Sequence, residues 1–480
     1  MITVWVLCAF AVRGSGQSIE AKVAELRAQF PALQHASFGY KFVDLASGKV
    51  LASAASSTFF TPASNTKLYT TACALVRLGP DYRFRTEVRT TGRWQPGQPS
   101  VPDLLLVGGG DPDLSGRALP YRVDAGEGDP LASLRELVES VWSAGVREVR
   151  GNVEAVASRY AGDPYPDGWT LDDTNYGYGA PVSALTFNDN TVALILRPSE
   201  TGELADVELR PATPHFVISN QVVTVAGKDE HIRLERPDAS NELVLRGSIG
   251  DQTDEWRVEV AVDTPAHWIA WQFAELLRER GITVRGQTGT RADACSCPLI
   301  AARESAPLSQ VIQVVNKVSQ NLHAEMLLRE VAVARGNDGT LENGLRERQA
   351  FLNEAGVIPD GSRAVLADGS GLARHDLTTP DFTVALLQYM WERPEREIWL
   401  HSLPVGHIDG TLQRRFRGIA GAQRVHGKTG SLAHVATLSG YIEKRAGGWI
   451  AFSVMVNAAV GRDMQTRDFI DKLCAFFLDS

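Results

Sequence analysis

The N-terminal part of the chain switches between two spacings of apolar positions, and each spacing predicts one kind of element. Ile19, Val23, Leu26 and Phe30 recur at helical intervals, which predicts a helix over residues 18–30. The stretch that follows alternates instead around a Ser-Gly pair and reads ASFGYKFVDLASGKVLASA. Alternation around such a pair predicts a β-hairpin after the first helix.

A second helix is predicted after this hairpin. Thr61 is suited to cap it, Pro62 suits its first turn, and a Gly-Pro pair at 79–80 ends it. Ser64 and Lys67 then lie in the first turns of one helix. Residues three apart share a helix face, so the amine can approach the hydroxyl. Among the nine lysines of the chain, only Lys67 has a serine three positions upstream.

The middle of the chain has a different pattern of apolar and turn residues from its two ends. Residues 90–285 form short β-rich segments between Gly, Pro and Asp turns, and a helical pattern covers 263–281. The chain is then mainly helical as far as residue 390. Residues 424–459 predict three antiparallel strands, and a last helix is expected over 466–479. Since the first hairpin and these strands can share one sheet, the middle is expected to hold inserted β domains. A length of 480 residues allows two to four domains.

Three short motifs occur in order on a helix, at a break between helices and on a strand. They are S-x-x-K at Ser64 and Lys67, S-x-N at Ser319 and Asn321, and K-T-G at Lys428, Thr429 and Gly430. Each motif is common by chance when it stands alone. In this order and on these elements they form a pattern typical of serine acyl transferases.

Acyl transfer explains why these residue types are needed. We expect Ser64 to attack a carbonyl and Lys67 to take its proton. Burial and the neighbouring charge of Lys428 can keep the Lys67 amine neutral part of the time. Ser319 can relay a proton between that amine and the leaving nitrogen, while Asn321 can hold the substrate amide.

The strand motif is suited to bind the substrate. Thr429 can bond a substrate carboxylate, to which Lys428 adds positive field. The backbone N–H of Ser431 can join that of Ser64 as an oxyanion hole. Gly430 is expected to let the substrate backbone lie close to the strand.

Each motif also has a purely structural interpretation. Ser64 can act as a second helix cap, with Lys67 as a solvated helix residue. Ser319 and Asn321 can cap the helix that follows them, although capping and catalysis are compatible. Other catalytic patterns do not compete, because the chain lacks G-x-S-x-G and H-E-x-x-H, and VGGGDPDL lacks the Gly-Lys-Ser/Thr ending of a phosphate loop.

Charge and cysteine usage narrow the possible partners. The formal net charge of -9 argues against nucleic acid, whose binding proteins concentrate positive charge on one face. Cys295 and Cys297 can form a local bridge in an oxidising compartment. Without a second pair of ligands they do not indicate a zinc site, so no metal is expected. Residues 1–17 contain a short apolar run, which predicts a secretory signal peptide and export to the periplasm.

The chain resembles the class C low-molecular-mass penicillin-binding proteins, a family of D-alanyl-D-alanine carboxypeptidases and endopeptidases. Besides the three motifs, the resemblance rests on LLLVGGGDPDLS, YGAPVSALTFNDN, LADGSGLAR and HIDGTLQRRF, and it covers nearly the whole mature chain. It implies an α/β (α+β) fold with a transpeptidase-like domain, whose antiparallel sheet lies between helices, and two nested β-rich inserted domains. The implied division is 18–90 with 285–480 for the catalytic domain, 91–189 with 259–284 for the second, and 190–258 for the nested third.

The resemblance also implies a function. Such an enzyme removes terminal D-Ala from peptidoglycan stem peptides, and can cut D-Ala cross-links, through an acyl-enzyme on Ser64. β-Lactam antibiotics would be its covalent inhibitors, and no cofactor is implied. Asp173 and Tyr178 match positions that line a pocket for the side chain of the stem-peptide diamino acid, whose free amine suits an acidic residue. Asp172 is the adjacent alternative for that carboxylate.

Two departures from the family pattern are small, and two other functions stay open. The S-x-N motif is Ser-Gln-Asn here, and Ser431 follows K-T-G where relatives often have Thr.

A β-lactamase would need an efficient deacylating water, and a catalytically silent wall-binding scaffold would need none of the motif residues. The oligomeric state is left open.

Overall fold

The computed structural model describes residues 18–478, except 127, 238–239, 360 and 462. The predicted signal peptide at 1–17 lies outside the described residues. Within the described part, no helix is both long and apolar enough to cross a membrane.

One five-stranded antiparallel sheet joins the two ends of the chain, in the order β17-β18-β19-β1-β2. Its strands are β1 (Ser37–Asp44), β2 (Val50–Ala54), β17 (Val425–Leu432), β18 (Val435–Glu443) and β19 (Trp449–Asn457). The predicted sharing of one sheet by the first hairpin and the three late strands is confirmed. Strand β17, which carries the K-T-G motif, lies at the edge of this sheet beside β18.

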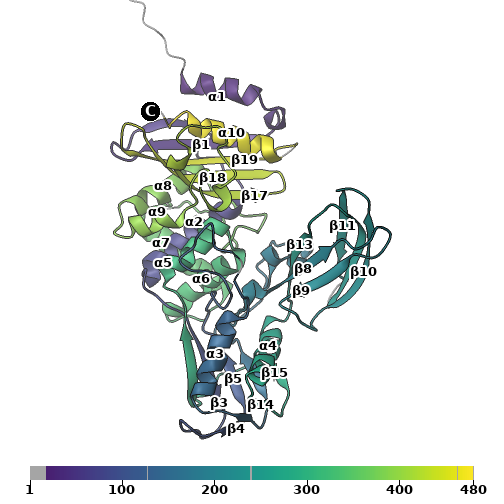
Figure 1. Ribbon diagram of the computed structural model, residues 1–480. Helices are drawn as coiled ribbons and strands as arrows, with labels where there is room; N and C mark the ends of the chain where they lie inside the picture. The colour runs from purple at the N-terminus through teal and green to yellow at the C-terminus, as the bar shows by residue number, and fades with distance from the viewer. Residues whose placement is uncertain (1–17, 127, 238–239, 360, 462, 479–480) are drawn as a thin grey trace, which may run out of the picture.

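Helices cover both faces of this sheet (Figure 1). On one face lie α1 (Ile19–Ala28) and α10 (Asp463–Ala475). On the other lie α2 (Thr66–Leu78), α5 (Leu308–Gln313), α6 (Asn321–Ala334), α7 (Leu341–Glu354), α8 (Pro380–Trp391) and α9 (Arg396–Ser402). Side chains alternate along a strand, so Phe42 packs into the core beside α10 while Val43 packs into the core beside α2. The expected antiparallel sheet between helices is confirmed.

A second five-stranded sheet is built from the inserted part, in the order β15-β7-β5-β3-β16. Its strands are β3 (Arg85–Thr90), β5 (Leu104–Val107), β7 (Val153–Val156), β15 (Thr288–Thr290) and β16 (Leu299–Glu304). A small sheet of β4 (Ser100–Val101), β6 (Glu148–Val149) and β14 (Thr283–Val284) lies beside it, with α3 (Ala132–Ser143) and α4 (Pro265–Glu279) (Figure 1).

The strand pairing differs from the expected boundaries at 90 and 285. Strands β3 and β16, which that division assigned to the catalytic domain, pair with each other and extend the inserted sheet instead. Local sequence pattern marks a strand but not its partner, which is the reason for the difference. The division into domains stays a prediction, and the pairing favours boundaries before Arg85 and after Glu304.

Two three-stranded sheets form the remaining part of the insertion, which projects to one side (Figure 1). One contains β8 (Thr191–Arg197), β9 (Asp206–Arg210) and β13 (Trp256–Ala261), and the other contains β10 (Val217–Val225), β11 (Glu230–Glu235) and β12 (Glu242–Gly250). Cys295 and Cys297 pair as a disulfide near the end of the insertion, with their Cα atoms 5.0 Å apart.

Candidate active site

The nucleophile candidate lies on a strained turn at the start of α2. Ser64 belongs to a 3-10 turn over Ala63–Asn65, and the α-helix begins only at Thr66, so Thr61 does not cap the helix as predicted. The residue before Ser64 has a φ of +49°, a left-handed conformation that costs energy outside glycine. The two side chains still meet, because Lys67 Nζ donates to Ser64 Oγ at 3.0 Å.

Lys67 is fully buried and its amine faces three oxygen acceptors. Besides Ser64 Oγ, they are Asn321 Oδ1 at 2.5 Å and the Ser370 carbonyl at 2.7 Å. Three acceptors match the three protons of an ammonium group, so the orientation of the amine is fixed on all sides. Asn321 was expected to hold the substrate amide, and here its oxygen holds the lysine.

Burial sets the protonation of this amine. It lowers the pKa of Lys67 to about 7, although the carboxylates of Asp368, Glu325 and Asp376 oppose the shift. Burial, followed by the charge of Lys67, also holds the pKa of Lys428 well below its ordinary value. Burial and the charge of Lys428 were both expected to keep this amine neutral part of the time, and burial is the largest cause of the shift. A group with a pKa near 7 can exchange a proton at neutral pH.

Ser319 lies where a π-helix over Val314–Val318 gives way to α6. Its φ of +67° is left-handed, and π-helical turns with such outliers are frequent at functional sites. This bend brings the hydroxyl to the strand motif, where Lys428 Nζ donates to Ser319 Oγ at 2.8 Å. The S-x-N and K-T-G motifs therefore meet through a buried lysine.

The exposed side of β17 carries hydroxyl groups with neighbours from two other segments. Thr429 Oγ1 donates to Thr411 Oγ1 at 2.8 Å, and Arg467 of α10 donates to Ser431 Oγ at 3.4 Å. Two adjacent hydroxyls and a nearby guanidinium are donors suited to a carboxylate.

The absence of a side chain at Gly430 allows the strand to pack closely against the protein. A Cβ built on it would meet the side chain of Thr437 and the carbonyl oxygen of Pro62. The glycine therefore allows β17 to lie against the turn that holds Ser64. The expected approach of a substrate backbone to this strand stays a prediction.

One loop of the insertion reaches Asn321 of the site. Asn321 Nδ2 donates to the Tyr178 carbonyl at 2.7 Å, and the Tyr178 hydroxyl donates to Asp173 Oδ1 at 3.2 Å. The other oxygen of Asp173 accepts bonds from the backbone and hydroxyl of Thr170. Burial, followed by the charge of Asp173, raises the pKa of Tyr178 to about 12, so the phenol stays protonated and donates. Asp172 is exposed.

A cavity of about 790 Å³ opens beside the S-x-N motif, between this loop and the inserted sheets. Ser319, Gln320 and Asn321 line it together with Tyr178. It is much larger than the space that one small leaving group needs.

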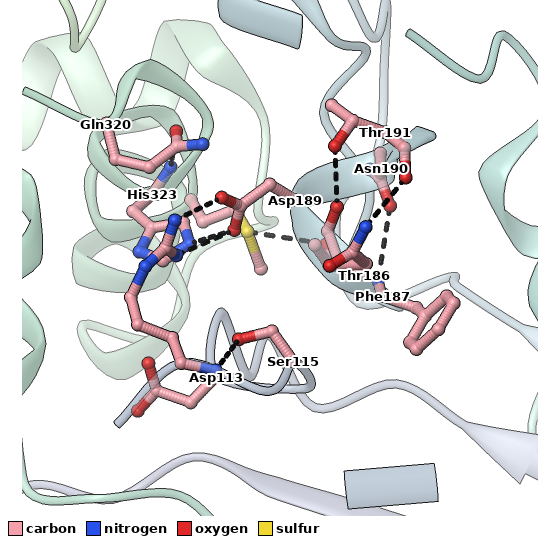
Figure 2. A network of polar contacts seen from close by, with 12 residues as sticks. Asp113, Ser115, Thr186, Phe187, Asp189, Asn190, Thr191, Gln320 and His323 are labelled. Carbon is pink, nitrogen blue, oxygen red and sulfur yellow. Dashed lines mark hydrogen bonds and ion pairs between the residues drawn. The ribbon is translucent and has the colours of Figure 1, made fainter. Parts of the chain in front are cut away.

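A carboxylate anchors the insertion to the helix that carries Asn321 (Figure 2). Asp189, with a φ of +56°, accepts two bonds from Arg117 at 3.1 and 2.8 Å and one contact from His323 Nε2 at 2.8 Å. Burial alone would raise the pKa of Asp189, but the charges of Arg117 and His323 outweigh it and hold this pKa well below its usual range. The carboxylate therefore stays ionised and joins the two parts.

Several site residues were not identified from the sequence. Asp368 and Ser370 lie in LADGSGLAR, and Thr411 lies in HIDGTLQRRF, two segments that carried the family resemblance without an assigned role. Their contacts with the motifs are long-range, so only the resemblance could have signalled them. In the described part of the chain, no three His, Cys, Asp or Glu side chains gather as metal ligands would.

Comparison with known proteins identifies the same family over nearly the whole chain. The model of the D-Ala-D-Ala carboxypeptidase 3 (S13) family matches residues 19–476. A D-alanyl-D-alanine carboxypeptidase from Actinomadura sp. (strain R39) is 35% identical over 463 residues, covering 92% of this chain and 82% of the relative. D-alanyl-D-alanine carboxypeptidase DacB from Haemophilus influenzae is 24% identical over 450 residues, covering 93% and 90%.

The fold is similar to that of solved structures. Penicillin binding protein 4 from Haemophilus influenzae has a TM-score of 0.81 at 23% identity, covering 95% of this chain and 99% of that one. The same protein complexed with a β-lactam has a TM-score of 0.74 at 22% identity, covering 96% and 100%. These likenesses confirm the predicted fold.

The Asp189 anchor yields a stability prediction. Asp189→Asn should lower the free energy of unfolding by about 2 to 3 kcal/mol at pH 7, because a charged acceptor is lost and Arg117 keeps its charge. Since the pKa of Asp189 is depressed in the folded state, its stabilisation is present above the unfolded pKa of about 4 and is lost as the pH falls. Denaturant unfolding at pH 7 and pH 3 measures both effects. The exposed Asp206→Asn is the control, and an equal loss in both variants at pH 7 would contradict the anchor.

Proposed function

This chain belongs to the D-Ala-D-Ala carboxypeptidase 3 (S13) family and is a serine peptidase, and we propose that it removes terminal D-Ala from peptidoglycan stem peptides through an acyl-enzyme on Ser64. The observation that supports this role is the hydrogen bond from Lys67, whose pKa is about 7, to Ser64 Oγ at 3.0 Å. A buried amine of this pKa can serve as general base at neutral pH. A serine and a base within hydrogen-bond reach form the minimal unit of nucleophilic catalysis.

Acylation then follows from the contacts. As Ser64 Oγ attacks the carbonyl of the last peptide bond, its proton passes to neutral Lys67 and a tetrahedral oxyanion forms. The backbone N–H groups of Ser64 and Ser431 are the proposed donors to that oxyanion. The leaving D-Ala nitrogen takes a proton by way of Ser319, which Lys428 holds at 2.8 Å. Collapse releases D-Ala, and water then hydrolyses the ester by the reverse proton path.

Specificity is proposed to come from the two ends of the substrate. Thr429 and its neighbour Thr411 bind the terminal carboxylate, and the guanidinium of Arg467 beside Ser431 adds a positive charge, since hydroxyl donors and a cation complement an anion. At the other end, Asp173 receives the free amine of the diamino acid. Its carboxylate already accepts bonds from Tyr178 and from its own loop, which keep it in place while lone pairs remain for an ammonium group.

Cleavage of D-Ala cross-links is a second proposed activity. A carboxypeptidase needs room for one amino acid as the leaving group, whereas an endopeptidase must accept a whole second stem peptide. The cavity of about 790 Å³ next to Ser319 and Asn321 supports the larger leaving group.

Export to the periplasm is proposed from the apolar run inside residues 1–17 and from the Cys295–Cys297 disulfide, because disulfides persist in oxidising compartments. The peptidoglycan substrate lies in the same compartment. Fractionation of expressing cells, with intact mass of the recovered chain, should find it in the periplasmic extract with its N-terminal segment removed. Recovery of the full-length chain in the cytoplasmic extract alone would contradict export.

Penicillin should form a stable covalent adduct on Ser64. The strained amide of the drug acylates the same hydroxyl, and we expect the ester to persist for minutes or longer. Intact mass over time with peptide mapping measures it. Ser64→Ala should abolish the adduct, and Lys67→Ala should slow its formation by about 100-fold or more because the general base is lost.

Other outcomes of this experiment separate the alternative functions. Rapid turnover of penicillin with only a transient adduct would favour a β-lactamase. A folded protein that forms no adduct would favour a silent scaffold. Acylation of Lys67→Ala at the normal rate would remove that lysine from the mechanism.

Asp173→Asn should weaken the turnover of stem peptides that bear a free side-chain amine. Removal of one charge of a partly desolvated pair costs about 1 to 3 kcal/mol, which is roughly 5- to 150-fold in kcat/KM. Penicillin acylation should change little, because the drug has no side chain that reaches this loop. The measurement is the ratio of peptide kcat/KM to penicillin acylation rate.

The adjacent exposed Asp172→Asn is the matched control for this prediction. Equal losses in both reactions of Asp173→Asn would indicate a displaced active site. A peptide-specific loss in Asp172→Asn alone would move the pocket to that neighbour.

A further inference from the structure

A fully buried carboxylate organises the loop that lies behind Lys67. Asp368 Oδ1 accepts from the backbone N–H of Gly371 at 2.6 Å. Its Oδ2 accepts from the N–H of Ala373 at 2.8 Å and from the hydroxyl of Ser370 at 3.1 Å. The backbone of this loop therefore wraps around one side chain that has no exposure to solvent.

This loop supplies one of the three acceptors of the Lys67 amine. The Ser370 carbonyl accepts from Lys67 Nζ at 2.7 Å. The next residue, Gly371, has a φ of +81°, and a Cβ there would collide with the carbonyl of Ala63, just before the nucleophile. The loop thus fits directly under the Ser64 turn, and a change in its path moves the acceptor of the lysine.

The same carboxylate also holds the substrate loop of the insertion. Trp169 Nε1 donates to Asp368 Oδ2 at 2.9 Å. Trp169 immediately precedes the turn that contains Asp173, and that turn leads to Tyr178, whose carbonyl accepts from Asn321. One buried group therefore contacts both the lysine loop and the loop proposed to select the substrate.

Titratable groups face Lys67 from several elements. Asp368 and Asp376 come from the segment before α8, Glu325 comes from α6, and Lys428 comes from β17. Of these carboxylates, Asp368 does most to raise the pKa of Lys67 against the effect of burial. Its removal should therefore favour the neutral amine at lower pH.

We propose that Asp368 is a positioning residue that orients the Lys67 amine through the Ser370 carbonyl and holds the substrate loop through Trp169. This role rests on the proposed functions of Ser64 and Lys67. Asp368 does not touch the substrate, and it acts only through the two loops that its carboxylate joins.

The test is the pH dependence of penicillin acylation in Asp368→Asn. Acylation of the wild type should rise with pH through the pKa of Lys67, because only the neutral amine accepts a proton. In the variant, the rising part (the limb) of the plot of acylation rate against pH should move to lower pH by about one unit, as expected from loss of a nearby opposite charge. The acylation rate at high pH (the plateau) should also fall about tenfold or more, because an amide cannot accept all the hydrogen bonds that the carboxylate accepts. Asp368→Glu keeps the charge, so its limb should stay in place while its plateau falls.

Trp169→Phe tests the second contact by removing only the indole N–H. The KM for a stem peptide should rise about tenfold or more, as expected from the loss of one hydrogen bond to a charged acceptor. Asp44→Asn is the matched control, since Asp44 is a buried carboxylate that holds a distant turn through Ser47. Its acylation profile should equal that of the wild type.

The outcomes separate this proposal from the proposed function. No acylation of the wild type by penicillin would overturn the function itself. Normal acylation of the wild type, together with an unshifted limb and an unchanged plateau in folded Asp368→Asn, would overturn the role of Asp368. If that variant does not fold, an unchanged plateau in Asp368→Glu and an unchanged peptide KM in Trp169→Phe would overturn it equally.

Discussion

The candidate active site depends on the burial of one lysine. Lys67 has no exposed surface, and its amine is held by oxygens from Ser64, Asn321 and Ser370. An amine without water must have its protons satisfied by the protein, so α2, α6 and the loop before α8 must meet at one point. The same burial brings the pKa of this amine to about 7, where it can act as a base.

Local strain accompanies this convergence. Ala63 and Ser319 both adopt left-handed conformations that cost energy outside glycine, and both stand at the motifs. The packed sheet and helices around them provide the stability that maintains these turns. Gly371 and Gly430 lie where the loop and the edge strand press on the turn of Ser64, and any side chain would prevent that approach.

The insertion is part of the site as well as an appendage of the fold. Tyr178 bonds to Asn321, Trp169 bonds to Asp368, and Asp189 bonds to His323 of α6. These three contacts hold the insertion against the helix and loop that surround Lys67.

The sequence by itself determined the chemistry and the order of the elements. The three motifs predicted a nucleophile, a base and substrate-binding strand residues, because acyl transfer requires these residue types. The spacing of apolar positions placed the motifs on a helix, at a break between helices and on a strand. Only the tertiary structure decided which strand pairs with which, moving β3 and β16 into the inserted sheet, and which face Gly430 presents. It alone also brought Asp368, Ser370 and Thr411 to the motifs. Contacts between residues hundreds of positions apart depend on the packing of the whole core, and a local sequence pattern does not predict them.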